Sequence, residues 1–295
     1  MLTKEYLHYL IVLLLFLTGT LFYYVYTQQE QAPLTVHFLD IGQGDAILIS
    51  DDRGNQILID GGPNGRKLLY QLGKEMPLLD KKIEAVILTH PDADHLTGLL
   101  DLLESYQVEI FLNNGQRESN PLFKELEKLL SEKKIFTKKV NAGDLLKFGE
   151  VELLVLSSGG ENDKNKNQAS VVAKLIYGEN SFLFTGDIEA EKESQLVLNN
   201  ADLKADWLKV GHHGSANGTS NFFLRKVQPR HAAISVGEKN RFGHPASVVL
   251  ENLKKHKVNI WRTDKQGTIS VECDLNRCVP KTKNNLKTID TRFGN

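Results

Sequence analysis

The stretch Thr89-His90-Pro91-Asp92-Ala93-Asp94-His95 constrains this chain more than any other feature. It places two imidazoles and two carboxylates within six residues, directly after the apolar run at 85–88. Such a run before a polar loop is typical of a buried strand, and imidazole and carboxylate are ligands for zinc, manganese and iron. The pattern predicts a metal-binding loop at a strand end. A polar loop whose Asp94 caps the next helix would have the same composition.

Strand and helix patterns alternate along most of the chain. The apolar runs at 45–50 and 56–60 have strand character, and an amphipathic helical pattern follows at 95–105. The alternation continues to the region of residue 271 without an internal repeat or a linker rich in proline and glycine. A chain of 295 residues fits one large domain or two smaller ones. The unbroken alternation predicts one α/β domain over 34–272.

The charges are unevenly distributed, although the formal net charge is only −1. Residues 1–200 carry 19 Lys and Arg against 29 Asp and Glu, whereas residues 201–295 carry 17 against 8. A basic C-terminal third is compatible with an anionic substrate on that part of the protein. A solvated face with a basic tail would give the same asymmetry. We expect residues 279–295 to form a basic flexible tail.

The first 28 residues predict a membrane anchor. No charged residue occurs between positions 6 and 27, which matches the roughly 20 helical residues that cross a bilayer. No small-residue cleavage site and no cysteine follow the run, so a signal anchor is favoured over a cleaved signal peptide or a lipoprotein. Lys4 precedes the run and the next basic residue is Arg53, so we expect an extracytoplasmic body.

Two cysteines, Cys273 and Cys278, enclose four residues of turn-like composition. In an extracytoplasmic body they would close a hairpin as a disulfide, and two free thiols are almost as reasonable. Because no second cysteine pair exists, the spacing is only weak support for a metal site.

Three further polar stretches follow apolar runs in the same way. Asp187 comes after the run at 182–184 and a glycine, where its carboxylate could bridge two metal ions. His212 and His213 stand side by side between two glycines, which core packing does not explain. His244 precedes a proline, where a role as a simple loop residue is as reasonable as a functional one.

Together these motifs resemble the metallo-β-lactamase superfamily. The resemblance rests on His-x-Asp-x-Asp-His at 90–95, Thr-Gly-Asp at 185–187 and His-His-Gly-Ser at 212–215. Within the superfamily, the chain is similar to the extracytoplasmic hydrolase domain of ComEC/Rec2-type competence proteins. Further matching stretches are 40–46, 60–62, 167–170, 242–245 and 262–264. Because only one apolar span is expected here, the resemblance does not imply the DNA-conducting pore of those proteins.

The resemblance implies a four-layer αββα sandwich, here preceded by the predicted transmembrane helix, with two divalent ions where strand ends converge. The residues that it assigns to the ions are His90, Asp92, Asp94, His95, Asp187, His212 and His213. The first two would hold one ion and the next two the other, with Asp187 bridging them. Either His212 or His213 would complete the second site.

Two positions depart from the commoner superfamily pattern. Asp92 stands where histidine is usual, and its harder oxygen ligand makes manganese a competitor to zinc. Asn167 stands where many members have a ligand histidine, so we expect the first ion to be bound weakly.

The resemblance also implies a mechanism. Two ions would generate a bridging hydroxide, which Asp94 would orient toward an electrophile. We expect Lys209, Ser215 and Arg241 to bind an anionic substrate, and His244 to protonate the leaving oxygen. A phosphodiester suits such a site. The leading expectation is therefore a membrane-anchored, outward-facing phosphodiesterase or nuclease that acts on DNA without an organic cofactor.

Two alternatives stay open. The same hydroxide could open a small phosphodiester of the phosphorylcholine type, a lactone or a lactam. The chain could instead be a non-catalytic cell-surface binding protein that keeps the metal site as a scaffold, although every expected ligand residue is present. Trp207 and Trp261 fall within predicted strands, so the sequence offers no dense set of aromatic residues for stacking on nucleic acid.

Overall fold

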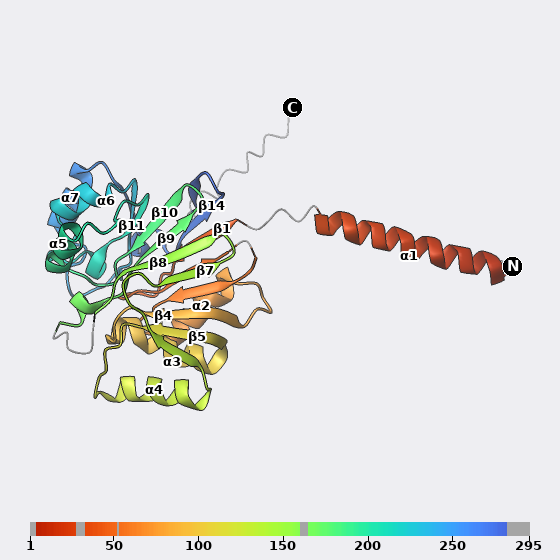
Figure 1. The fold of residues 1–295 in the computed structure, drawn as a ribbon, viewed down its shortest axis with the longest axis horizontal. Coiled ribbons are helices and arrows are strands. Elements are labelled where there is room, and N and C mark those ends of the chain that lie inside the picture. Colours follow the sequence, from red (N-terminus) through yellow and green to blue (C-terminus); the bar gives the residue numbers. More distant parts are fainter. Residues whose placement is uncertain (1–3, 28–32, 52, 160–164, 282–295) are drawn as a thin grey trace. The chain divides into compact units, whose positions relative to one another are not determined.

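The computed structural model describes residues 4–27, 33–51, 53–159 and 165–281 (Figure 1). Its contacts separate two units, Met1–Ala32 and Pro33–Asn295. In the first unit, Lys4–Thr27 forms helix α1. Across the described parts of the chain, no helix combines the length and apolarity that crossing a membrane requires, so the predicted transmembrane helix is not supported.

Two β-sheets form the centre of the second unit. In the described residues, one sheet has the strand order β15-β14-β1-β2-β3-β4-β5-β6 and the other has the order β13-β12-β11-β10-β9-β8-β7. The strands of the first sheet are β1 (Leu34–Phe38), β2 (Ile47–Ser50), β3 (Gln56–Ile59), β4 (Lys82–Leu88), β5 (Gln107–Asn113), β6 (Phe136–Lys139), β14 (Ile269–Cys273) and β15 (Cys278–Lys281). Those of the second are β7 (Leu145–Phe148), β8 (Val151–Ser157), β9 (Val172–Tyr177), β10 (Asn180–Phe184), β11 (Trp207–Lys209), β12 (His231–Ile234) and β13 (Asn259–Arg262).

Helices cover the outer face of each sheet. Helices α2 (Gly65–Glu75), α3 (Ala93–Ser105) and α4 (Pro121–Glu132) share one apolar cluster with the first sheet. Helices α5 (Ala190–Leu198), α6 (Asn221–Val227) and α7 (Ser247–Lys255) share another with the second. Three shorter helices are η1 (Asn167–Ala169), η2 (Gly211–Gly214) and α8 (Thr263–Gln266).

A third apolar cluster fills the space between the sheets. Phe38 of the first sheet packs against Trp207 of the second, with ring centroids 6.4 Å apart, and both side chains are buried. Burial of large aromatic side chains from both sheets removes much apolar surface from water and holds the sheets together. The layers therefore run helix, sheet, sheet, helix, which confirms the predicted αββα sandwich.

The start of α3 is fixed by close backbone contact with the loop after β3. Gly61 N donates to the His95 carbonyl over 2.7 Å, and Gly98 N donates to the Gly62 carbonyl over 2.9 Å. A Cβ atom on Gly98 would lie 1.9 Å from the Gly61 carbonyl oxygen, so only glycine allows this approach. The contact holds the first turn of α3, which carries two of the predicted ligands, against the end of the neighbouring strand.

The C-terminal hairpin is closed by a disulfide. Cys273 and Cys278 face each other across β14 and β15 and are bonded, so the structure has the disulfide and not two free thiols. Strand β15 continues to Lys281 and therefore includes 279–281 of the predicted tail. The remainder of that tail, 282–295, lies outside the described residues.

Candidate metal centre

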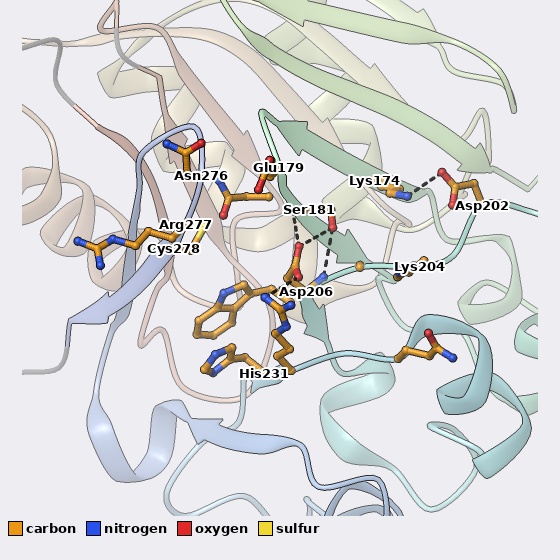
Figure 2. Close-up of a pocket in the computed structure, with 15 residues that line it drawn as sticks. Lys174, Glu179, Ser181, Asp202, Lys204, Asp206, His231, Asn276, Arg277 and Cys278 are labelled. Atoms are coloured by element: carbon orange, nitrogen blue, oxygen red, sulfur yellow. Dashed lines mark hydrogen bonds and ion pairs between the residues drawn. The ribbon is translucent and has the colours of Figure 1, made fainter.

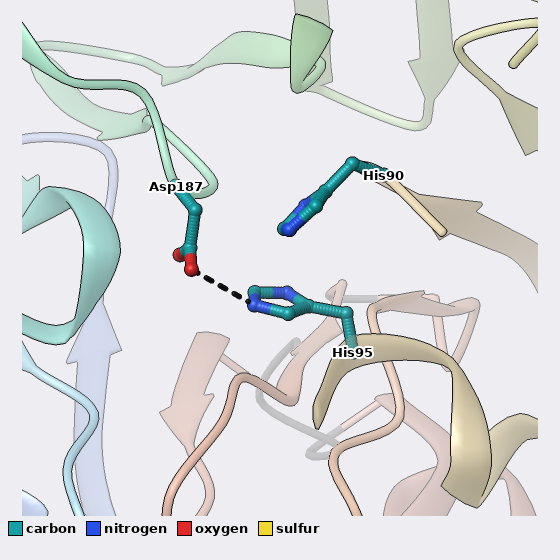
Figure 3. A group of neighbouring side chains, drawn as sticks. All are labelled: His90, His95 and Asp187. Carbon is teal, nitrogen blue, oxygen red and sulfur yellow. Dashed lines mark ion pairs between the residues drawn. The ribbon is translucent and has the colours of Figure 1, made fainter. Parts of the chain in front are cut away.

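Three loops at strand ends meet to form the centre. His90 and His95 follow β4 of the first sheet, Asp187 follows β10 of the second, and His213 follows β11 beside it. Strand β4 runs parallel to its neighbours β3 and β5, and β10 runs parallel to β11, so the loops after these strands gather at one edge. Figure 3 shows His90 and His95 with their rings directed toward Asp187.

Asp187 is the carboxylate around which the imidazoles gather. Its Oδ2 lies 3.3 Å from Nε2 of His95 and 3.3 Å from Nε2 of His213. His213 Nε2 is also 3.3 Å from Oδ2 of Asp94, and the rings of His90 and His95 are 4.2 Å apart. In each of the groups His90/His95/Asp187 and Asp94/His95/His213, one ligand atom per residue lies within 4.8 Å of the others.

The three buried histidines direct their Nε2 atoms at this cluster. The Nδ1–H of His95 donates to Asp60 Oδ2 (2.8 Å), and that of His213 to the Ser235 carbonyl (3.0 Å). His90 Nδ1 lies 3.0 Å from Thr89 Oγ1, whose own hydrogen goes to Asp60.

This network assigns the proton to Nδ1 of each ring. The Nε2 atoms of all three are buried and lack a hydrogen-bond partner in the described residues. Buried polar atoms are normally satisfied, and imidazole Nε2 beside carboxylate is a donor set for divalent cations, so the residues fit such ions.

Opposite charges balance within the centre. Burial alone would raise the pKa of Asp187, but the charges of His213, His95 and Lys209 outweigh it and hold that pKa well below its usual value. Burial opposes the charged form of His95 as well, yet Asp187 and Asp60 raise its pKa well above the ordinary value. Burial and the nearby His95 lower the pKa of His90 to about 3, which keeps that ring neutral.

Lys209 was predicted to bind substrate, but its side chain is buried inside the protein. Its ammonium is fully buried, forms an ion pair with Asp45, and donates to the Gly186 carbonyl over 2.9 Å. It also lies 3.5 Å from Asp187 Oδ1. Burial would lower the pKa of Lys209, but Asp45 and Asp187 raise it, so the ammonium stays charged and offsets part of the negative charge of these two carboxylates.

The adjacent histidines take different positions. Both adopt left-handed backbone conformations, with φ of 46° at His212 and 53° at His213, and this turn separates their side chains. His213 is buried in the cluster. The His212 side chain is 26% exposed, its Nδ1 is 3.1 Å from Glu189 Oε1, and its Nε2 is 4.0 Å from Asp187. His213 is therefore the better-placed ligand.

Asp92 lies at the edge of the cluster. Its Oδ2 is 3.7 Å from Nε2 of His90, while its Oδ1 pairs with Lys166 Nζ at 3.2 Å. Lys166 also contacts Glu118. The Asp92 carboxylate is therefore already paired with a cation of the chain.

Asn167 forms no hydrogen bond with His90 in the described residues, and its amide lies 3.4 Å from His212 Nδ1.

The remaining predicted residues lie around the rim. His244 contacts His212 edge to face, with ring centroids 5.8 Å apart, and burial, aided by His212, lowers the pKa of His244. Arg241 is exposed. Ser215 is buried, and its hydroxyl accepts from Asn217 N over 3.4 Å in the turn after η2. The structure does not bring the Ser215 hydroxyl into the cluster of possible ligands.

Sequence reasoning gave no site role to Asp45, Asp60 or Glu189. Asp45 pairs with Lys209, and Asp60 orients His95. Both belong to stretches that carry the family resemblance, and Asp60 follows an apolar strand in the same way as Asp187. The position of Asp60 directly after a strand could therefore have identified it as a site residue. Glu189, which contacts His212, had no comparable signal.

A cavity of about 750 Å³ lies away from the metal centre, at the opposite ends of the same strands (Figure 2). It includes Ser181 at the start of β10, Trp207 at the start of β11 and His231 at the start of β12. Its lining is mostly polar, with carboxylates and basic groups paired to one another, as in the contact of Lys174 with Asp202 (2.7 Å). None of the predicted site residues lines it.

Two curated proteins and one solved structure illustrate what the chain is similar to. ComE operon protein 3 of Bacillus subtilis is 33% identical over 79% of this chain and 32% of its own length. Recombination protein 2 of Haemophilus influenzae is 29% identical over 84% of the chain and 30% of its own length. The chain thus spans about a third of these relatives. CmlA, a diiron β-hydroxylase of Streptomyces venezuelae, has the same fold, with a TM-score of 0.55 and 14% sequence identity. The superposition covers 83% of this chain and 55% of the CmlA chain.

The family model described as the metallo-beta-lactamase superfamily matches residues 39–238. That span contains the loops after β4, β10 and β11 and therefore His90, His95, Asp187 and His213. The αββα layers and the cluster at the strand ends agree with this match. The chain belongs to the metallo-β-lactamase superfamily, whose members are generally metal-dependent hydrolases, and within it resembles the ComEC/Rec2-type competence proteins.

Proposed function

We propose that this protein is a phosphodiesterase that depends on divalent metal ions and cleaves DNA. The observation that carries the proposal is the convergence of three buried, unpartnered imidazole Nε2 atoms on Asp187. The name of one relative, Recombination protein 2, supports DNA as the substrate. Because the chain spans only about a third of such relatives, their activities are carried over here as part of the proposal.

The proposed ligands are the residues around that carboxylate. His90 and Asp92 would hold one ion, Asp94, His95 and His213 the other, and Asp187 would serve both. When bound, zinc or manganese ions there would activate water and stabilise the charge that develops on a phosphoryl group. The sequence left open whether His212 or His213 completes the second site. We assign His213 to it, because His212 pairs with Glu189 instead.

Residues at the rim would handle the substrate. Asp94, whose side chain is 37% exposed, faces both the cluster and solvent and can accept a hydrogen bond from an attacking water. Among the described residues Arg241 forms no ion pair with a carboxylate, so its guanidinium is available to a phosphate. A phosphate beside His244 would raise the lowered pKa of that ring and favour the protonated form, which can donate to the leaving oxygen.

A substrate panel tests the proposal. Purified protein, reconstituted with Mn²⁺ or Zn²⁺, is assayed on single-stranded DNA, a phosphorylcholine-type diester, a lactone and a lactam. We expect cleavage of DNA that EDTA abolishes, and a loss of at least 100-fold in Asp187→Asn, because removing an electrostatic contributor typically costs about that much. The matched control is Asp202→Asn, which neutralises an exposed carboxylate in the cavity at the opposite strand ends and should leave the rate unchanged.

The other outcomes are equally informative. Hydrolysis of the lactone or lactam without DNA cleavage would replace the proposal with the small-substrate alternative. Metal binding without hydrolysis of any substrate would favour a non-catalytic binding protein.

The catalytic domain is further proposed to work in an oxidising compartment outside the cytoplasm. The Cys273–Cys278 disulfide supports this location, because disulfides persist mainly in extracytoplasmic environments. Alkylation of unreduced protein from intact cells should label neither cysteine. Labelling of both would contradict the oxidised state, and protection of the body from protease added to intact cells would contradict the outward orientation.

A further inference from the structure

An exposed aromatic ring stands beside the metal centre. Phe242 is 56% exposed, so much of its ring is open to solvent. We propose that Phe242 is a stacking platform for an unpaired nucleobase, and that it directs the site toward single-stranded nucleic acid. This inference rests on the proposed phosphodiesterase function and specifies its substrate.

Ring contacts connect Phe242 to the centre. Its ring is stacked on His244, with centroids 5.7 Å apart and an angle of 26° between the planes. The rings of His244 and His212 meet edge to face with centroids 5.8 Å apart, and His212 Nε2 lies 4.0 Å from the Asp187 carboxylate. In this series of contacts, only the rings of His244 and His212 lie between Phe242 and the cluster, so a strand with a base on Phe242 would extend beside the proposed ligands.

The loop that carries Phe242 is held in one shape by the amide of Asn240. The Asn240 Nδ2 group donates to the carbonyls of Gly237 and His244, both at 2.9 Å. Its Oδ1 accepts from Phe242 N (3.2 Å) and His244 N (3.0 Å). Four hydrogen bonds from one side chain fix the loop before substrate arrives, which lowers the entropy cost of stacking a base on it.

The neighbouring charges suit a nucleic-acid strand. The Arg241 guanidinium carbon lies 5.3 Å from the centroid of the Phe242 ring, so a cation and an aromatic surface are presented together. The Arg241 side chain is exposed and can rotate to pair with a phosphate, so that a base can stack on the Phe242 ring in its place. Single-strand binding sites combine these two elements, a cation for the backbone and an aromatic ring for the base.

Stacking on Phe242 requires a base that is not paired in a duplex. A base inside a double helix is covered on both faces by its neighbours, so it reaches a protein ring only after it leaves the stack. The platform therefore favours single strands, frayed ends and unpaired segments over intact duplex.

Binding measurements test this inference without relying on catalysis. A fluorescent oligothymidylate and an oligonucleotide of equal length built from abasic residues are titrated in EDTA. Wild-type protein should bind the base-containing strand about 5- to 150-fold more tightly, the range expected for one stacked base. Phe242→Ala should abolish this preference, and Phe242→Trp should retain it.

Phe222 offers a matched control. It is 38% exposed on α6, and Arg225 lies over its ring at 5.8 Å in a similar arrangement, but none of the proposed ligands contacts it in the described structure. Phe222→Ala should bind both strands as wild type does. Equal affinity of wild-type protein for the two strands, or an unchanged preference in Phe242→Ala, would overturn the inference.

The inference and the proposed function can fail separately. Suppose that Mn²⁺- or Zn²⁺-loaded protein cleaves base-containing and abasic strands with equal KM, and that Phe242→Ala changes neither KM value. The proposed phosphodiesterase function then stands, and the stacking role of Phe242 is refuted. If the protein cleaves no phosphodiester but binds bases through Phe242, the platform stands and the nuclease is refuted.

Discussion

The rings of His95 and His213 lie 5.4 Å apart, although the two residues follow strands of opposite sheets. His95 lies in the first turn of α3 after a strand of the first sheet, and His213 lies in η2 after a strand of the second. Each Nε2 is 3.3 Å from the same Asp187 oxygen. The cluster therefore forms only when the two sheets are packed, so ions bound there would stabilise the folded sandwich.

The two adjacent histidines should differ in their effect on metal binding. His213→Ala removes a buried nitrogen of the cluster and is expected to eliminate one tightly bound ion per chain. His212→Ala changes a partly exposed ring that Glu189 holds and should leave the number of ions unchanged. Calorimetric titration with Mn²⁺ or Zn²⁺ measures both stoichiometries. The reverse order of effects would show that His212 is the ligand.

Asp60 should affect metal affinity without touching an ion. Its carboxylate fixes the His95 ring through Nδ1, and removal of such an orienting partner typically costs about 10- to 100-fold in metal affinity. Asp60→Asn is therefore expected to weaken the His95-containing site by that factor. Asp51→Asn is the control, because Asp51 is also buried but caps a turn through Asn55 N. Equal affinities in the wild type and Asp60→Asn would exclude this role.

Lys209 should stabilise the protein most when metal is absent. Lys209→Met would leave Asp45 and Asp187 buried without their shared cation, which typically costs about 3–5 kcal/mol in the free energy of unfolding. Added Mn²⁺ should recover part of the loss, since the ion supplies positive charge at Asp187. Urea unfolding of the variant and of the exposed control Lys204→Met measures both effects. A loss below about 1 kcal/mol would contradict the neutralising role.

Acid should destabilise the protein through His37. Burial lowers the pKa of this histidine from 6.5 to about 4, despite the opposing charge of Glu272. Between these two values the unfolded chain binds a proton that the folded protein does not, so stability is lost as pH falls from 6.5 to about 4. In metal-free samples, His37→Gln should remove about 3 kcal/mol of this pH dependence. Parallel stability curves for both proteins would contradict the assignment.

The sequence predicted the arrangement of the centre where strand ends determine it. His90, His95 and Asp187 each follow an apolar run, and the ends of parallel strands gather at one edge of a sheet. Their convergence therefore follows from the αββα architecture that the motifs implied. The assignment of the N-terminal segment as a transmembrane helix rested on the length and apolar composition of an uncharged run, and the structure does not support it.

Other features depend on three-dimensional details that residue order does not contain. The different positions of His212 and His213 follow from the left-handed backbone of η2, whereas neighbouring histidines are equivalent in a motif. Lys209 was expected to bind an anionic substrate, but its strand is buried and its partner Asp45 lies 164 positions earlier in the chain. The exposure of Phe242 is set by the loop that Asn240 holds, and a lone phenylalanine gives no sign of it.

Metal content is the most direct measure of whether the clustered residues form a two-ion centre. Wild-type protein is saturated with Mn²⁺ or Zn²⁺, freed of excess ions and analysed for metal per chain, alongside Asp187→Asn. We predict two ions per wild-type chain and a clear deficit in the variant, in which the carboxylate proposed to serve both ions has become an amide. Wild-type protein that retains no divalent ion, or a variant that retains the same two, would contradict the account.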